Sequence, residues 1–232
     1  MQNLLTVRWI LIYDWIEGEG KVKYKNHLVF SVIFLLVLSG CDRPRLTGVE
    51  FEKIDTSQDP RQTPYKSGEP ILIKIEGGFV SISPLAEYKV SGVVVSKKSY
   101  FDDWESKISP VDLAFVWGKL GEPEFDKYIT YSQSNRWYFY NYKPKSPFDN
   151  AYVISHSGNN HIIPANENIY RAVKTIGKKD EVIMEGYLVN LKGTYKGREV
   201  SWNTSLSRTD TGNGSCELFY VSKVRKGTKI YE

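Results

Sequence analysis

Four side chains in this sequence could do chemistry together: His156, His161, Cys216 and Asp210. The two histidines lie in SHSGNNHIIPA, residues 155–165, and the other two lie in SLSRTDTGNGSCE, residues 205–217. A cysteine thiol becomes a nucleophile when an imidazole base is beside it and a third polar group orients that base. These residues therefore support one hypothesis, an envelope hydrolase or a thiol-dependent enzyme.

The same residues also have plainer interpretations. Histidines five positions apart do not share a helix face, and no zinc-ligand spacing is present, so we expect neither a metal nor a cofactor. On a loop between a strand and a helix, the histidines could simply pin the backbone. Cys216 has the parity of Leu218 and Tyr220 on a predicted strand, and a small buried side chain is a common role for a free cysteine.

A second group of residues suits binding rather than catalysis. In RWYFYNY, residues 136–142, strand alternation puts one set of side chains on one face: Arg136, Tyr138, Tyr140 and Tyr142. We expect Trp137 and Phe139 on the buried face, which leaves the tyrosines to stack on sugar rings or bases. Arg208, near Gly212 and Gly214, could bind an anion. Ordinary sheet surface and a tight connection between strands are the alternatives.

Runs rich in β-branched and aromatic residues, separated by turn residues, predict mostly strands. The expected strands are residues 71–78, 87–100, 128–133, 136–142, 151–155, 181–193, 198–205 and 216–224, the third and fourth forming a hairpin around Ser134-Asn135. Two helices are expected. One begins at the Ser109-Pro110 capping signal and runs to Val116 or Trp117, and the other begins at Asn166.

The order of these elements favours an α+β, strand-dominated fold. Glycine within a strand, as at Gly92 and Gly186, often marks a bend of the kind that barrel closure needs. A helix before the second of these strands resembles the oligonucleotide/oligosaccharide-binding (OB) fold. The resemblance implies an OB-like, partly open β-barrel with two helices over residues 87–225, with residues 101–150 as an insert.

The N-terminal segment points outside the cytoplasm. Lys21, Lys23 and Lys25 precede an apolar run of eleven residues, 28–38, which as a helix would span only ~16 Å of a ~30 Å bilayer core. The run ends in Leu38-Ser39-Gly40-Cys41, which resembles the lipobox of bacterial lipoproteins. This resemblance implies cleavage before Cys41 and a lipid anchor on its thiol. It also implies, from Asp42, retention at the periplasmic face of the inner membrane if the host has two membranes.

These features predict three parts. Residues 1–40 form a signal peptide, of which 1–21 would be a start-site artefact if translation begins at Val22. Residues 41–70 form a lipidated flexible tether, and residues 71–232 form a single β-rich globular domain. The formal net charge of +4 is spread along the chain without a basic block, so no nucleic-acid partner is expected.

Several segments of the expected domain are similar to an uncharacterised bacterial protein family with no established activity. They are residues 108–114, Trp117-Gly118 and the two segments that hold the histidines and Cys216. The sequence therefore favours a membrane-anchored lipoprotein of the cell envelope, whose non-catalytic domain binds an envelope protein or glycan. The enzyme hypothesis is the alternative.

Overall fold

The structure is a computed structural model that describes residues 43–65, 68–210, 212 and 214–232. The predicted signal peptide, Cys41 and Asp42 lie outside the described residues. Within those residues, no helix is long and apolar enough to cross a membrane.

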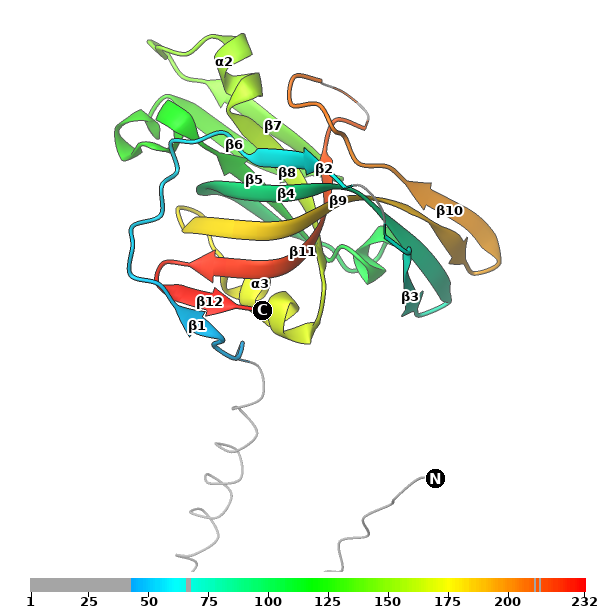
Figure 1. Cartoon of the computed structure of the whole chain (residues 1–232). Coiled ribbons are helices and arrows are strands. Elements are labelled where there is room, and N and C mark those ends of the chain that lie inside the picture. The colour runs from blue at the N-terminus through cyan, green and yellow to red at the C-terminus, as the bar shows by residue number, and fades with distance from the viewer. Residues whose placement is uncertain (1–42, 66–67, 211, 213) are drawn as a thin grey trace, which may run out of the picture. The chain divides into compact units, whose positions relative to one another are not determined.

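Strands dominate the domain, and the described part of the chain holds two α-helices (Figure 1). The elements are β1 Gly48–Val49, β2 Arg61–Pro64, β3 Ile71–Ile75, β4 Gly78–Ser99, β5 Val111–Val116, β6 Ile129–Ser134, β7 Trp137–Tyr142, α2 Asn150–Ser155, β8 Ser157–Pro164, α3 Glu167–Thr175, β9 Glu181–Tyr195, β10 Arg198–Trp202, β11 Glu217–Lys226 and β12 Lys229–Tyr231. Three short 3₁₀ turns lie at Glu105–Lys107, Gly118–Gly121 and Pro123–Phe125.

Five of the strands close a circuit. β4 pairs with β5, β5 with β8, β8 with β11, β11 with β9, and β9 returns to β4. Only the β8–β11 pair in this circuit is parallel, and α3 lies in the connection between β8 and β9. The α+β, strand-dominated, OB-like architecture expected from the sequence is therefore confirmed.

The sheet is only partly closed and is not a regular barrel. β4 is 22 residues long and β9 is 15, and both continue past the circuit to pair with β3 and β10. Gly186 of β9 lies where β9 pairs with β4 on one side and β11 on the other. A Cβ at Gly186 would lie 1.9 Å from the carbonyl oxygen of Tyr220, so only glycine fits this close approach.

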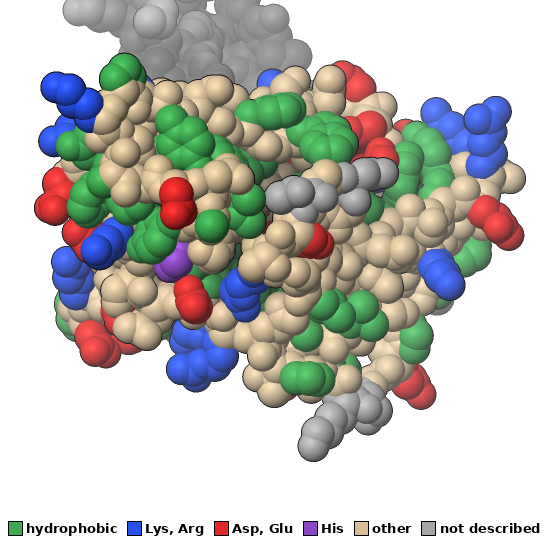
Figure 2. Space-filling view, turned by 90° about the horizontal axis from the view of Figure 1, so that it is seen from above, with side chains coloured by type: hydrophobic (Ala, Val, Ile, Leu, Met, Phe, Trp, Pro, Cys, Tyr) green, Lys and Arg blue, Asp and Glu red, His purple; other side chains and the backbone are tan. Residues whose placement is uncertain are grey.

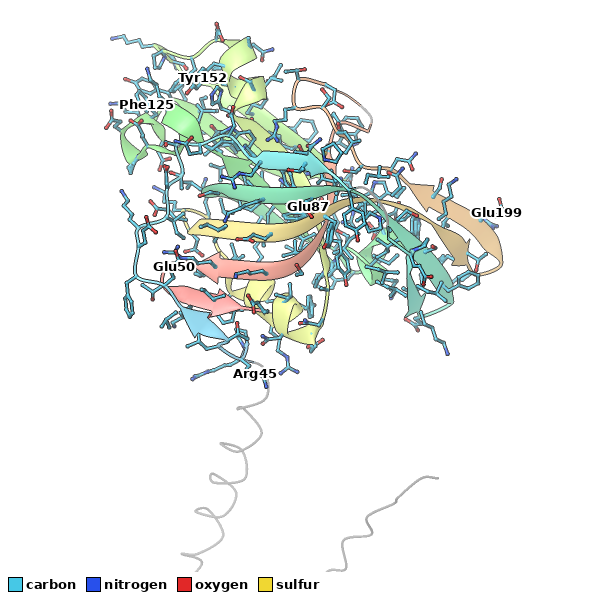
Figure 3. The ribbon with its side chains drawn as sticks, viewed as in Figure 1. Arg45, Glu50, Glu87, Phe125, Tyr152 and Glu199 are labelled. Atoms are coloured by element: carbon cyan, nitrogen blue, oxygen red, sulfur yellow. The ribbon has the colours of Figure 1, made fainter. Side chains whose placement is uncertain are left out.

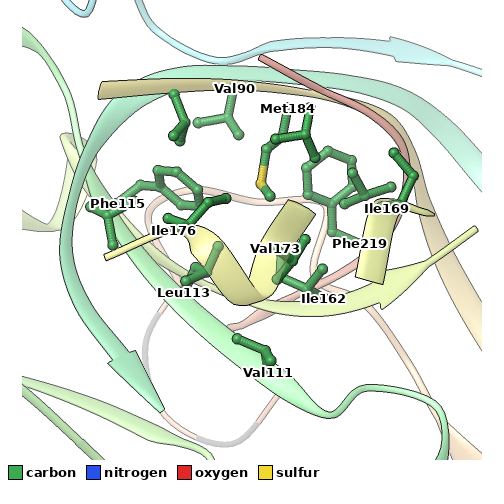
Figure 4. Close-up of a cluster of buried hydrophobic side chains, with 14 of the residues drawn as sticks. Val90, Val111, Leu113, Phe115, Ile162, Ile169, Val173, Ile176, Met184 and Phe219 are labelled. Atoms are coloured by element: carbon green, nitrogen blue, oxygen red, sulfur yellow. The ribbon is translucent and has the colours of Figure 1, made fainter. Parts of the chain in front are cut away.

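The main core lies inside the circuit and against α3 (Figure 4). Alternation along the strands turns apolar side chains inward, including Leu113, Ile162 and Phe219, which are fully buried. Ile169, Ala172 and Val173 of α3 complete the cluster. The Asn166 side chain caps this helix by accepting a hydrogen bond from the backbone amide of Ile169, as its sequence predicted.

Three local predictions were wrong. Residues 111–116, expected in a helix, form the fully buried strand β5. A short apolar run buried on both faces reads as strand once the neighbouring strands are in place, and the Ser109-Pro110 signal has no helix to cap. Residues 151–155, expected as a strand, belong to α2, which Asp149 caps by accepting from the backbone amide of Tyr152. The expected loop at 155–165 is largely β8.

The described part of the expected tether is attached to the domain. β1 pairs with β12, and β2 pairs with β4. The Asn168 side chain of α3 accepts from the backbone amide of Arg45 at 2.6 Å and donates to its carbonyl at 3.0 Å. Asp59 accepts a hydrogen bond from the indole of Trp117 at 2.9 Å. The prolines and polar residues of this segment predict a flexible linker, whereas β1 and β2 pair along edges of the sheet.

Candidate functional site

A buried ion cluster lies on the outer face of β5 and β8. Asp112 is fully buried, and its Oδ1 lies 3.0 Å from Nη1 of Arg136 and 2.9 Å from Nδ1 of His161. The approach to His161 is close, but its direction does not make a hydrogen bond. Arg136 also binds Asp103 through Nη2 at 2.9 Å and Nε at 3.3 Å. Two carboxylates thus share one guanidinium, the fully buried one of Asp112 and the partly exposed one of Asp103.

The sequence places these groups through strand register and one turn. Asp112 pairs directly with His161 across β5 and β8, and both point away from the apolar core. Arg136 lies in the turn between β6 and β7, where Asn135 and Arg136 have φ values of 49° and 68°. Two consecutive positive φ angles are typical of the tight hairpin turn that matches strand twist. This turn directs the guanidinium into the cluster.

Aromatic rings surround the cluster. The guanidinium of Arg136 lies 3.8 Å from the ring centre of Tyr100 and 5.5 Å from that of Trp202. The His161 ring lies 4.7 Å from that of Trp202. Burial acts to raise the pKa of Asp103, but the hydrogen bonds and charge of Arg136 outweigh it and lower that pKa below its ordinary value. The ion pair with Arg136 therefore favours the ionised form of Asp103.

A cleft of about 480 Å³ opens beside the cluster. It is lined by residues of the β4–β5 connection, the hairpin turn, β8, β10 and the segment before β11: Glu105, Asn135, Arg136, Trp137, His161, Ser201, Trp202, Asn203, Gly212, Gly214 and Cys216. In OB folds, ligands bind on the face of the second and third barrel strands, between the loop joining strands one and two and the loop joining strands four and five. Here those elements are β5, β8, residues 100–110 and residues 196–216, so the cleft lies at the corresponding position.

Figure 2 shows this end of the domain from above, looking onto α2, the β6–β7 hairpin and the loop before β11. Hydrophobic side chains, a class that includes tyrosine and tryptophan, lie among uncharged polar groups on this face. Most Lys, Arg, Asp and Glu side chains lie towards its edge.

A smaller chamber of about 250 Å³ adjoins the cleft and shares Trp137, Gly212 and Cys216 with it. Its other lining residues are Tyr138, Tyr140, Ile154, Ser157, Gly158, Asn159, Ser207, Arg208, Asp210, Ser215 and Glu217. Glu217 is 7% exposed. Burial raises the pKa of its carboxyl to about 8.

Buried polar atoms without a described hydrogen-bond partner concentrate around these two cavities. They belong to Ser109, Asp112, Gln133, Tyr138, Asn160, His161, Arg208 and Glu217. All of these residues lie on β5, β6, β7, β8, β11 or the segments that precede β5 and β11. Native proteins leave few such atoms, so this concentration indicates a place where solvent or a ligand completes the hydrogen bonds.

The four residues of the enzyme hypothesis do not converge. His161 and Cys216 line the same cleft, and Asp210 and Cys216 line the chamber. His156 lies elsewhere, stacked on Tyr152 with ring centres 3.9 Å apart, and its Nδ1 lies 2.9 Å from the Tyr152 carbonyl oxygen. Asp210 accepts a hydrogen bond from the hydroxyl of Ser205 at 2.6 Å rather than orienting a histidine.

Cys216 lacks the surroundings of a nucleophile. Burial raises the pKa of its thiol to about 12, although a contact from the Asn159 side chain at 3.6 Å acts in the opposite direction. A thiol with such a pKa stays protonated at neutral pH, and the thiolate is the reactive form. Among the described residues, no group of three His, Cys, Asp or Glu side chains could hold a metal ion.

The predicted orientation of the hairpin strand was wrong. Trp137 and Phe139 are 43% and 47% exposed, whereas Tyr138 and Tyr140 pack against a core cluster that includes Val116 and Val153. Strand alternation gives two faces but cannot say which is buried, and here Arg136, Tyr138 and Tyr140 face inward, whereas Tyr142 is exposed as predicted. Tyr140 and Tyr142 both donate to Oδ1 of Asn150, at 2.8 and 3.2 Å.

Three of the most buried polar residues of the site, Asp112, Asn159 and Asn160, are not among the predicted site residues. The predicted helix from Ser109-Pro110 covers Asp112, and the predicted loop covers Asn159 and Asn160. SGNNH has polar residues at both strand parities, so its pattern does not indicate a strand. Arg208, predicted to bind an anion, does line the chamber.

No family model, curated protein or solved structure matches this chain. The resemblances to bacterial lipoproteins and to an uncharacterised family therefore stay predictions.

Proposed function

We propose that this protein is a lipid-anchored lipoprotein of the bacterial envelope whose OB-like domain binds a glycan without transforming it. The observation that carries the proposal is the cleft beside Asp112 and His161. It occupies the position at which OB folds bind oligosaccharides, and buried polar atoms without described partners surround it.

The lining of the cleft suits a sugar chain. Sugar rings offer apolar faces and many hydroxyls, so they pair well with aromatic rings and with side chains that both donate and accept hydrogen bonds. Trp137 and Trp202 supply the rings, and Asn135, Ser201 and Asn203 supply the polar contacts. Arg136 is already bound to Asp103 and Asp112, so its role is to fix the hairpin turn rather than to hold the ligand.

The position of Arg45, near the first described residue, is compatible with an anchored binding module. Arg45 is hydrogen-bonded to α3, and a lipid on Cys41 would be four residues away, at most about 14 Å along an extended chain. Arg45 and Tyr152 lie at opposite ends of the domain (Figure 3). Tyr152 belongs to α2, which packs on β8 beside the cleft end. With the Arg45 end at the membrane, the cleft would face away from it.

The alternative, a thiol-dependent enzyme, has weaker support. It needs a base within hydrogen-bond distance of Cys216. The described side chain that contacts the thiol sulfur is instead the amide of Asn159, which is not a base. The high pKa of the Cys216 thiol also argues against a thiol-dependent enzyme.

The glycan proposal is tested by measuring the affinity of the purified protein for fragments of envelope glycan. We expect Trp137→Ala to weaken binding at least about tenfold, because truncating an aromatic anchor in a binding site costs ~2 kcal/mol. Phe51→Ala is the matched control, since Phe51 is 83% exposed and is not among the residues that line the cleft. Specific capture of one envelope protein, with no glycan bound, would replace a glycan by a protein as the partner.

The anchor is tested separately. Mass spectrometry of the membrane-extracted protein should find a lipid on Cys41 as the first residue, and Cys41→Ser should release the protein from membranes. An unmodified Cys41 in a soluble, full-length chain would contradict the lipoprotein proposal and leave the cleft proposal standing.

A further inference from the structure

The chamber next to the cleft carries a charge pattern that sugar binding does not use. Its volume of about 250 Å³ would hold roughly eight water molecules, which is enough for a small polar group and too little for a sugar chain. Two of its lining residues are an acid and a base that each have one buried polar atom without a described hydrogen-bond partner: Glu217 and Arg208.

Glu217 occupies a core-facing position of β11, where an apolar residue would be expected. It lies on the same face of β11 as Phe219 and Val221, which are fully buried in the main core. The Glu217 side chain lines the chamber, and its Oε2 accepts no hydrogen bond from any described residue. Burying a carboxyl without partners costs stability, so its presence calls for a partner that the fold does not supply.

Arg208 presents the complementary group. Its guanidinium lies 5.7 Å from the ring centre of Tyr88, on the wall of the circuit, and its Nη1 is buried without a described partner. Because the free Nη1 of Arg208 and the free Oε2 of Glu217 both lack hydrogen bonds, they do not bond to each other. Asp210, the other acid in the lining, is occupied by the Ser205 hydroxyl.

We infer that this chamber binds the zwitterionic head group of an α-amino acid, with the ammonium against Glu217 and the carboxylate against Arg208. An ammonium group has three donors for carboxyl oxygens, and a guanidinium matches a carboxylate as a planar fork. A ligand with a single charge would satisfy one side of the chamber and leave the other buried without a partner. Asn159 and Tyr138 line the remaining wall and can orient the ligand.

Proton linkage adds an independent signature. Burial raises the pKa of Glu217 to about 8, so the carboxyl is mostly protonated at pH 7 before a ligand enters. The charged and titratable groups that act on it are Arg208 and Asp210 from the preceding loop, and Tyr88 from β4. An ammonium placed against Glu217 favours the ionised carboxyl, so binding at pH 7 should release a proton.

The inference is tested by calorimetric titration of the full-length protein in detergent with free L- and D-amino acids. No glycan is present, so the result does not depend on the proposed function. We expect at least one amino acid to bind, and methylamine or acetate alone to bind at least about tenfold more weakly, because each lacks one charged contact. Glu217→Gln and Arg208→Gln should each weaken binding by about tenfold or more, and Phe51→Ala should not.

Two readouts separate a ligand site from a structural role. Glu217→Gln keeps the size of the side chain, and its melting curve shows whether the variant is folded. Titrations in two buffers of different ionisation enthalpy should show proton release for the unsubstituted protein and none for Glu217→Gln. The inference is overturned if the folded protein binds no amino acid with a Kd below about 10 mM. Equal affinity in the folded Glu217→Gln variant would overturn it as well.

Discussion

The inward face of β5 and β8 is mainly apolar, whereas the outward face combines buried apolar residues, Ala114, Val116 and Ile163, with a buried polar pair. Inward, Leu113, Phe115 and Ile162 join an apolar core that closes around α3. Outward, Asp112 and His161 are equally buried, yet they are polar and incompletely paired. The inward face is what any barrel of this kind needs to fold. This polar pair lowers stability where apolar residues would raise it, which supports the proposal that the pair is retained for binding.

Substitution in the inward face should have the largest effect on stability. Phe219→Ala removes a fully buried ring from the main core and should lower the free energy of unfolding by about 3–5 kcal/mol. Denaturant unfolding measures the change. The molecules that remain folded should bind glycan with unchanged affinity. A loss of glycan affinity in fully folded Phe219→Ala would contradict the assignment of binding to the outward face.

The outward ion cluster should come next. Arg136→Met leaves Asp112 buried without its cation and should cost about 3 kcal/mol. In the Asp112→Asn background the same substitution should cost clearly less, because the uncompensated charge is gone. Arg171→Met is the control, since Arg171 forms a surface pair with Glu167 and should change stability by less than ~0.5 kcal/mol. Equal losses of stability for Arg136→Met and Arg171→Met would contradict the claim that the buried cluster contributes more than a surface ion pair.

The chamber carboxyl should produce an effect of a different kind, one that depends on pH. The folded-state pKa of Glu217 is raised to about 8 from an ordinary value of 4.5, so between these values the folded state binds more protons than the unfolded state. Stability therefore falls as pH rises from about 5 to 8. The melting temperature of the unsubstituted protein should decline over this range relative to Glu217→Gln. Glu199→Gln, at an exposed position of β10, should follow the unsubstituted protein.

The smallest expected effect concerns the thiol. Cys216 lines the cleft, but Cys216→Ser is nearly isosteric, so it should alter glycan affinity much less than Trp137→Ala and stability by only about 1 kcal/mol. Because burial raises the pKa of this thiol to about 12, its labelling at pH 8 should be much slower than that of free cysteine. Rapid labelling of the folded protein would indicate a reactive Cys216 thiol and would support a functional role for it.

Much of the fold could be predicted because strand propensity and its interruptions are local. The glycine-bearing strands, the capped helix α3 and the hairpin follow from neighbouring residues alone. β5 and β8 could not be assigned in this way. VDLAFV is buried on both faces, so it shows no alternation, and SGNNH resembles a turn until β5 and β11 provide its hydrogen bonds.

The site was harder to predict than the fold for the same reason. Asp112 and His161 are 49 positions apart in the chain and meet only through the β5–β8 register. Arg136 was selected as an exposed binding residue, yet the hairpin turn directs it into the cluster. Glu217 lies beside Cys216 in sequence, and only the closed circuit turns it towards the core.

The most direct test of the account is hydrogen–deuterium exchange of the membrane-extracted protein with and without envelope glycan. Ligand in the cleft should slow the exchange of amides in β8, β10 and the β4–β5 connection, and leave those of α3 and β12 unchanged. Slowed exchange confined to α3 and β12, or no change at saturating glycan, would contradict the claim that the outward face of β5 and β8 is the binding site.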